Sequence, residues 1–271
     1  MSPPHTSSLK TPLSITHIDT ACAIIHLDGV NLITDPVFSS AGTTWDVGIT
    51  VLKKSSEPGL SIPQLPPIDA VLLSHEDHPD NLDELGRALL DARRVLTTPD
   101  GASKLAPRPG VQALHPWETV SLNIGGRHFS VTGTPCKHLP GGEVTGFILT
   151  APEFGQADDG RPNAIYFSGD TFYLEELAQM RERFHIAVAL LNIGRASVLL
   201  PDAERTLQIT MDGTQAARLF RDIGADILVP MHFEAWAHFT ETADELKREF
   251  EAEGVQDRVV WLQPGVETRI V

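Results

Sequence analysis

The sequence predicts one mixed α/β (α+β) domain arranged as a four-layer αββα sandwich, helix–sheet–sheet–helix. Short apolar or alternating segments that are typical of strands recur along the chain, and amphipathic segments with helical spacing separate them. Each sheet must bury a face, so strands with helices outside them are expected to stack as four layers. The 271 residues, 41% of them hydrophobic, can form one sizeable core. We expect a flexible N-terminal arm over residues 1–12 and a single domain over residues 13–271.

The first half of the chain is expected to consist mainly of strands. Segments 14–27 and 30–34 flank Asp28-Gly29, a dipeptide favoured in two-residue hairpins. Segment 45–67 is rich in Pro, Gly and Ser, and we expect a long loop that forms a wall or lid over a site, or else a surface excursion. Further expected elements are strands at 70–74, 95–98, 120–124 and 127–132, and helical segments at 82–92 and 102–105.

The second half is expected to alternate strands with helices. Its helices are predicted from apolar residues three or four positions apart, and its strands from short apolar runs. The expected strands are 144–150, 164–168, 186–193, 226–231 and 259–262, and the expected helices are 171–183, 211–223 and 242–253.

The most informative stretch follows the apolar strand at 70–73, which ends in His75, Asp77, His78, Asp80 and Asn81. A buried strand that leads into such a cluster delivers imidazoles and carboxylates to one point at the edge of a sheet. These groups suit zinc, and also manganese or iron. The alternative is a polar loop before a helix, with Asp80 or Asn81 as the helix cap and His78 in solvent.

Three other predicted strands end in residues of the same kind. The strand at 127–132 leads to His138, the strand at 164–168 leads to Asp170, and the strand at 226–231 leads to His232. Ligand-binding groups in layered α/β proteins gather where strands end and loops begin. The four strand ends therefore predict one shared metal site. The alternative for Asp170 is that it caps the helix expected from residue 171.

The order of these motifs resembles the metallo-β-lactamase superfamily, in its lactonase-like and N-acylphosphatidylethanolamine phospholipase D-like branch. The segment Gly-Val-Asn-Leu-Ile-Thr-Asp-Pro-Val-Phe at 29–38 is similar to an early strand of that branch, and the resemblance covers residues 15–271. It implies the four-layer αββα fold. It also implies two neighbouring metal sites with Asp170 between them; their other ligands would be His75, His78 and His138 at the first, and Asp80 and His232 at the second.

The chain departs from the family signature His-x-His-x-Asp-His. It has His75-Glu-Asp-His78-Pro-Asp80-Asn81, so one residue is inserted and Asn81 stands where the last histidine is expected. An amide oxygen is a weaker ligand than imidazole, which predicts one strong metal site and a weaker or empty second site. The insertion also leaves open whether His78 or Asp77 is the second ligand, because an ungapped alignment with the family signature puts Asp77 at that position.

The resemblance implies a metal-dependent hydrolase that uses metal-activated water on a lactone or another ester. Zn²⁺, Mn²⁺ or Fe²⁺ would be the cofactor. Asp80 or Asp77 would orient the attacking water and take its proton, and His238 would donate a proton to the leaving group. A phosphodiester hydrolase and a non-catalytic metal- or ligand-binding protein are the alternatives, and Asn81 is the residue that favours the latter.

Other residues near these strand ends have two interpretations each. Trp236, His238 and Phe239 either form a wall of the substrate pocket or pack the loop after His232. Asn192 follows another strand to the same predicted edge and is expected to contribute to the pocket. Arg195 either binds an anionic group or makes a surface ion pair.

Composition restricts the partners and the compartment. The net charge of −15 disfavours nucleic acid and anionic membrane surfaces, so we expect a small-molecule substrate. No apolar run is long enough for membrane insertion, and the N-terminus lacks a secretory core. The only cysteines are Cys22, expected in the core, and Cys136, a buried thiol or an additional ligand; two such cysteines are typical of a cytoplasmic protein. The sequence leaves open whether copies assemble into a homo-oligomer.

Overall fold

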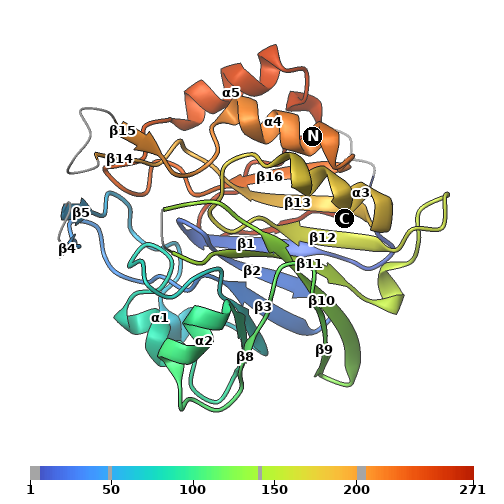
Figure 1. The fold of residues 1–271 in the computed structure, drawn as a ribbon, viewed down its shortest axis with the longest axis horizontal. Helices are drawn as coiled ribbons and strands as arrows, with labels where there is room; N and C mark the ends of the chain where they lie inside the picture. The colour runs from blue at the N-terminus through green and yellow to red at the C-terminus, as the bar shows by residue number, and fades with distance from the viewer. Residues whose placement is uncertain (1–6, 48–50, 140–141, 200–205) are drawn as a thin grey trace.

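Two sheets lie face to face in the middle of the molecule, and helices cover the outer face of each (Figure 1). The computed structural model describes residues 7–47, 51–139, 142–199 and 206–271. The four layers confirm the predicted αββα sandwich. Among the described residues, no helix is both long enough and apolar enough to cross a membrane.

The first sheet has seven strands in the order β17-β1-β2-β3-β6-β7-β8. Strands β1, β2 and β3 are antiparallel neighbours, whereas β3, β6, β7 and β8 run parallel to one another. The carboxyl ends of β3 and β6 therefore lie side by side at one edge. The strands are β1 (Ser14–Asp19), β2 (Cys22–Leu27), β3 (Val30–Thr34), β6 (Ala70–Leu72), β7 (Arg94–Thr97), β8 (Val111–Ala113) and β17 (Glu267–Arg269).

The second sheet has six strands in the order β16-β13-β12-β11-β10-β9, and β12, β13 and β16 are parallel. Parallel pairing again brings three carboxyl ends to one edge. Its strands are β9 (Thr119–Ile124), β10 (Arg127–Pro135), β11 (Thr145–Thr150), β12 (Asn163–Phe167), β13 (His185–Asn192) and β16 (Ile227–Met231). Two separate pairs are formed by β4 (Thr44–Asp46) with β5 (Val51–Lys53), and by β14 (Ser197–Leu199) with β15 (Thr206–Gln208).

Three hydrophobic clusters fill the three interfaces between the layers. The central cluster lies between the sheets, where the rings of Phe147 and Phe167 stack with their centroids 6.3 Å apart. A second cluster packs the first sheet against α1 (Glu84–Leu89) and α2 (Pro99–Leu105). A third packs the second sheet against α3 (Met180–Arg183), α4 (Gly213–Asp222) and α5 (Ala243–Ala252). The strand and helix periodicities in the sequence thus correspond to real buried faces.

The predicted hairpin at Asp28-Gly29 is confirmed. Leu27 pairs with Val30, and both turn residues have positive φ, 46° and 88°, as this kind of tight turn requires. The continuous strand expected over 14–27 is instead two strands, because Thr20 adopts a φ of 48° and the chain turns there.

Two expected elements of the second half are wrong in their limits. Segment 259–262 forms only a single bridge, between Val259 and Leu228, and the last strand is β17, whose exposed polar residues gave no apolar signal. The helix expected from residue 171 begins at Glu175, as the 3₁₀ helix η3 (Glu175–Gln179) followed by α3. Residues 171 and 172 are not helical because both are hydrogen-bonded to Lys137. The Lys137 amide donates to Thr171 Oγ1, and the Phe172 amide donates to the Lys137 carbonyl.

The part of the expected flexible arm that the structure describes, residues 7–12, packs against the domain. Leu9 is buried, and the Lys10 amide donates to the carbonyl of Phe154. Ser8 donates from both its amide and its hydroxyl to Asp226. Residues 1–6, which the same prediction covered, lie outside the described residues.

Candidate metal centre

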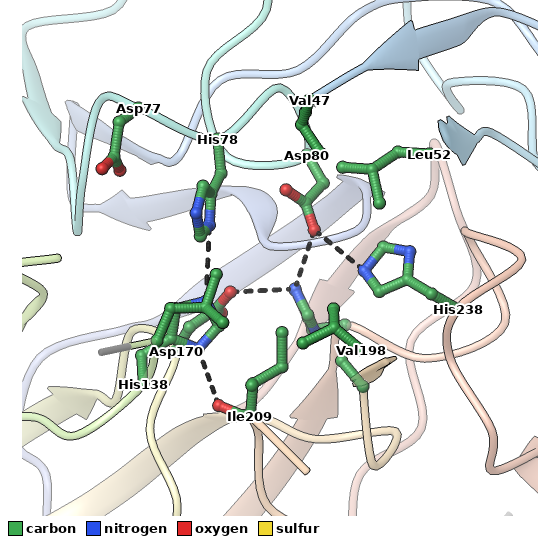
Figure 2. Close-up of a pocket in the computed structure, with 13 residues that line it drawn as sticks. Val47, Leu52, Asp77, His78, Asp80, His138, Asp170, Val198, Ile209 and His238 are labelled. Carbon is green, nitrogen blue, oxygen red and sulfur yellow. Dashed lines mark hydrogen bonds and ion pairs between the residues drawn. The ribbon is translucent and has the colours of Figure 1, made fainter. Parts of the chain in front are cut away.

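Side chains from four strand ends meet at the edge shared by the two sheets (Figure 2). The segment after β6 supplies three of them, and the segments after β10, β12 and β16 supply one each. They form two groups, within each of which the candidate ligand atoms lie within 4.8 Å of one another. The first group is His75, His78 and His138, and the second is Asp80, Asp170 and His232.

The histidine group has the spacing of ligands around one ion. His78 Nδ1 lies 3.0 Å from His75 Nε2 and 3.3 Å from His138 Nε2. Two ligands that bind a tetrahedral zinc at about 2.1 Å lie about 3.4 Å apart. Burial lowers the pKa of His75 and of His138, and nearby imidazoles lower both further. The rings of His75 and His138 are therefore neutral near pH 7, which is the form that binds a metal.

Backbone carbonyls orient two of the candidate ligands. His138 Nδ1 donates to the carbonyl of Ile209 at 2.6 Å, and His232 Nδ1 donates to that of Ile193 at 3.2 Å. A proton held on Nδ1 leaves Nε2 free to bind a cation, and metal-ligating histidines usually have such a partner.

His75 is oriented through a buried serine and a buried aspartate. Ser74 Oγ donates its proton to Asp35 Oδ2 at 2.6 Å. Ser74 Oγ therefore acts as the acceptor for His75 Nδ1, which lies 2.8 Å away. The Ser74 amide also donates to Asp35, and burial raises the pKa of Asp35 to about 7. Sequence reasoning missed Asp35 and Ser74. The available signal was that Asp35 ends β3, which pairs in parallel with the strand that carries His75.

Asn81 is in neither ligand group and does not cap the following helix. Its Nδ2 donates to Asp35 Oδ2 at 3.0 Å. The cap of α1 is Asp83, whose carboxylate accepts from the Gly86 amide, so Asp80 is not the cap either. The amide that replaces the family histidine therefore supports the Asp35 network.

The second group contains buried polar atoms that lack hydrogen-bond partners. Asp170 Oδ2 and His232 Nε2 lie 3.2 Å apart, and neither atom makes a hydrogen bond with any residue that the structure describes. Asn192, which we expected to line the pocket, instead donates from Nδ2 to Asp170 Oδ1 at 2.7 Å and holds that carboxylate. His232 Nε2 is also 3.9 Å from Asp80 Oδ2. Unsatisfied atoms of this kind, facing one another, fit a bound cation.

The electrostatics of the second group favour positive charge. Burial raises the pKa of Asp170 and of Asp80, but the surrounding imidazoles outweigh it and lower both below their usual range. Burial lowers the pKa of His232, yet Asp170 and Asp80 raise it to about 9. The two carboxylates are therefore ionised and attract either a proton onto His232 or a metal ion.

The geometry favours His78 over Asp77 as the candidate metal ligand that matches the second histidine of the family signature. The Asp77 carboxylate is partly exposed and lies 3.9 Å from Lys104 Nζ. Figure 2 shows it on the far side of His78 from Asp80. The amides of Asn81 and Leu82 both donate to the carbonyl of His78, and this tight turn follows the extra residue.

A cavity of about 220 Å³ opens onto both groups. Its polar lining includes His78, Asp80 and Asp170, with Asp77 and His238 beside them. Its apolar lining consists of Val47, Leu52, Leu139, Ala196, Val198 and Ile209. Val47 and Leu52 belong to the 45–67 segment, which thus forms a wall of the cavity as expected.

Of the three residues after His232 that we considered, only His238 lines the cavity. Trp236 is buried and donates from Nε1 to Thr20 Oγ1 at 3.0 Å. The ring of Phe239 packs on that of His232, with the centroids 4.3 Å apart. The two aromatic residues therefore pack the loop.

Arg195 and Cys136 have structural roles. Arg195 makes ion pairs with Glu241 at 2.8 Å and with Glu249 at 3.2 Å. Cys136 is a thiol that donates to the carbonyl of Ser168 at 3.3 Å, and burial raises its pKa. It belongs to neither ligand group.

Comparison with known proteins identifies the family. Residues 30–233 match the model of the beta-lactamase superfamily domain. The chain is 26% identical over 261 residues to a UPF0173 metal-dependent hydrolase of Methanopyrus kandleri, covering 93% of this chain and 98% of the relative.

Solved structures share the fold. An isothiocyanate hydrolase from Delia radicum gut bacteria has a TM-score of 0.75 at 19% identity, covering 94% of this chain and 98% of that one. A metallo hydrolase of Ignicoccus hospitalis has a TM-score of 0.69 at 20% identity, covering 95% and 98%. The chain therefore belongs to the beta-lactamase superfamily and has the metallo-β-lactamase fold, and relatives that match most of its length are named metal-dependent hydrolases.

Proposed function

We propose that the protein is a metal-dependent hydrolase that opens a small uncharged cyclic ester, such as a lactone. The observation that carries this proposal is the meeting of two ligand groups on a cavity whose other lining residues are aliphatic apart from Asp77 and His238. When bound, a divalent ion such as Zn²⁺ lowers the pKa of a coordinated water to about 7 and polarises the carbonyl oxygen under attack. The residues that would hold metal are His75, His78 and His138 at one site, and Asp80, Asp170 and His232 at the other.

Carboxylates at the cavity would handle the proton of the attacking water. Asp80 is buried and ionised, so its oxygens can accept a hydrogen bond from that water and orient it. Asp77 lines the cavity and is partly exposed, so it can take the proton and pass it to the leaving alkoxide or to solvent. The His238 ring is turned toward Asp80, which does not favour a role as proton donor to a leaving group.

The charge of the cavity favours a neutral substrate over a phosphodiester. Among the described residues that line it, the acidic side chains are Asp77, Asp80 and Asp170, and none is Lys or Arg. A phosphodiester anion would approach these carboxylates without a cationic side chain to offset the repulsion. The aliphatic wall can instead bury the hydrocarbon part of a lactone, at about 25 cal/mol per Å² of apolar surface.

The test is hydrolysis by metal-free and metal-loaded protein. We expect Zn²⁺- or Mn²⁺-loaded protein to hydrolyse γ-lactones with alkyl side chains, and to be much slower with bis(p-nitrophenyl) phosphate. Chelation should abolish the activity and the added metal should restore it. Full activity after chelation would rule out the proposal. Faster turnover of the phosphodiester would favour the alternative substrate class, and bound metal without any turnover would favour a non-catalytic binding protein.

We also propose that the protein is cytoplasmic. Cys22 and Cys136 are both free, which supports a reducing compartment. Cys22 is fully buried in the core, as its apolar context predicted.

A further inference from the structure

The second ligand group has only three members, which is one fewer than a closed tetrahedral site requires. Structural zinc sites have four protein ligands, and catalytic sites have three with one open position. The family pattern has a further histidine where this chain has Asn81, and the Asn81 amide is committed to Asp35. A fourth protein ligand would therefore have to come from elsewhere in the chain.

His238 lies where that ligand is needed. Its Nε2 is 3.5 Å from Asp80 Oδ2, and the same oxygen is 3.9 Å from His232 Nε2. Figure 2 shows the His238 ring pointing at the Asp80 carboxylate from the side opposite His78. The His238 side chain is 13% exposed and lines the cavity.

The His238 ring makes a long ion pair with Asp80 and packs on the ring of Phe239, with the centroids 4.7 Å apart. His238 Nδ1 is buried and has no hydrogen-bond partner within the described part of the chain. The 3.5 Å from Nε2 to the Asp80 oxygen exceeds the usual range of about 2.7–3.2 Å for an N–H···O bond. A buried imidazole that faces a carboxylate at this distance has the spacing of two ligands that share an ion, about 3.4 Å in a tetrahedral site.

We propose that His238 is the fourth ligand of the second metal site, together with Asp80, Asp170 and His232. The separations between neighbouring donor atoms are 3.2 Å from Asp170 to His232, 3.5 Å from His238 to Asp80 and 3.9 Å from His232 to Asp80. The His238–Asp80 separation is close to the tetrahedral value of about 3.4 Å. His238 is not one of the three residues whose ligand atoms all lie within 4.8 Å of one another, so its ring has to move closer to Asp170 and His232 when the ion binds. Two imidazoles and two carboxylates suit zinc, and also manganese or iron.

The loop that carries His238 is held on both sides, as a ligand requires. The Ala237 amide donates to the carbonyl of Lys53 at 2.9 Å, and the Ser197 amide donates to the carbonyl of His238 at 3.1 Å. The preceding Trp236 is 1% exposed. A side chain on a backbone fixed in this way can bind an ion with little further ordering.

The inference rests on the proposed metal-dependent function but changes its metal content. With His238 as a ligand, the replacement of the family histidine by Asn81 does not leave the second site short of a donor. We therefore expect two ions of comparable affinity per chain, in place of the weak or empty second site that the sequence alone predicted.

The experiment is a metal titration of the chelator-stripped protein in the absence of substrate. Co²⁺ is added to wild type and to H238A, and bound ions are counted from the d–d absorption bands and by elemental analysis after desalting. Wild type should bind two ions. H238A should keep one, at the three-histidine site, and lose affinity for the other by on the order of 100-fold, because even outer-shell partners contribute about 10–100-fold. H128A, which changes an exposed histidine of β10, is the matched control and should still bind two.

Two results would overturn the assignment: an H238A protein that binds two ions with wild-type affinity, or a wild-type protein that binds only one. H238D, which supplies a carboxylate, should recover the second ion at least in part. If H238A does not fold, as judged by its melting curve, H238Q replaces it in the same titration. Because ions are counted without substrate, a failure of lactone hydrolysis would leave this result standing.

Discussion

A buried ion pair anchors the wall of the cavity and offers a sharp test of the packing. Lys54, directly after β5, has a side chain that is 0% exposed, and it pairs with Asp19 of β1, which is 2% exposed. Lys54 Nζ also donates to the carbonyl of Ser56 at 2.9 Å. Since β5 carries Leu52, the pair fixes the position of a residue that lines the cavity.

The expected energies follow from which groups lose their partners. K54M leaves the Asp19 carboxylate buried with only hydroxyl donors, from Ser56 at 2.7 Å and Thr20 at 3.3 Å. Breaking such a pair should lower the free energy of unfolding by about 3–5 kcal/mol, and D19N should cost a similar amount. The double variant K54M/D19N contains no buried charge and loses mainly the donor to the Ser56 carbonyl, at about 1–3 kcal/mol.

The assay is urea unfolding of metal-free protein, monitored by tryptophan fluorescence, since the centroid of the Trp236 ring lies 5.8 Å from Lys54 Nζ. The control is K247M, which removes the 54% exposed partner of Asp244 and should change the free energy by about 0.5 kcal/mol or less. We expect the double variant to be more stable than either single variant. Costs that add in the double variant, or a K54M cost below about 1 kcal/mol, would refute the reasoning.

Three further predictions follow from the site and its surroundings. D35N should weaken zinc binding by about 10–100-fold in a chelator competition, because it loses its charged hold on Ser74 and thus on His75; unchanged affinity would contradict that role. Burial, followed by the neighbouring Glu249 charge, raises the pKa of Glu241 to about 8, so the folded protein holds this proton more tightly than the unfolded chain. Stability should therefore fall as pH rises from about 4.5 to 8, and the fall should be smaller in E241Q; parallel urea midpoints for both proteins would exclude the shift. V47D, at a 40% exposed position on the cavity wall, should lower kcat/KM for γ-lactones with long alkyl chains and spare short ones, whereas an equal loss for all chain lengths would argue against an apolar wall.

The fold could be predicted because its information is local. Apolar strands such as 70–73 and 164–168 are recognisable one at a time, and their number leaves few layer arrangements. The strand β17 could not be predicted in this way, because it is short, polar and exposed, and its only support is pairing with β1.

The meeting of the six candidate ligands at one edge could be predicted for a similar reason, since each lies in a segment that follows a strand recognisable in the sequence. That these residues bind metal stays a prediction. The groups around them depend on distant pairing. Asp35 reaches Ser74 because β3 lies parallel to β6, and the position of the His238 ring depends on how the loop after β16 packs. The choice between Asp77 and His78 depends on a turn whose backbone bonds no periodicity encodes.

Anomalous X-ray diffraction from crystals grown with Zn²⁺, recorded at the zinc absorption edge, tests the central claim most directly. We predict a peak about 2.1 Å from His75 Nε2, His78 Nδ1 and His138 Nε2, and a second peak beside Asp170 and His232. Crystals that contain zinc but show no peak between those three imidazoles would contradict the account.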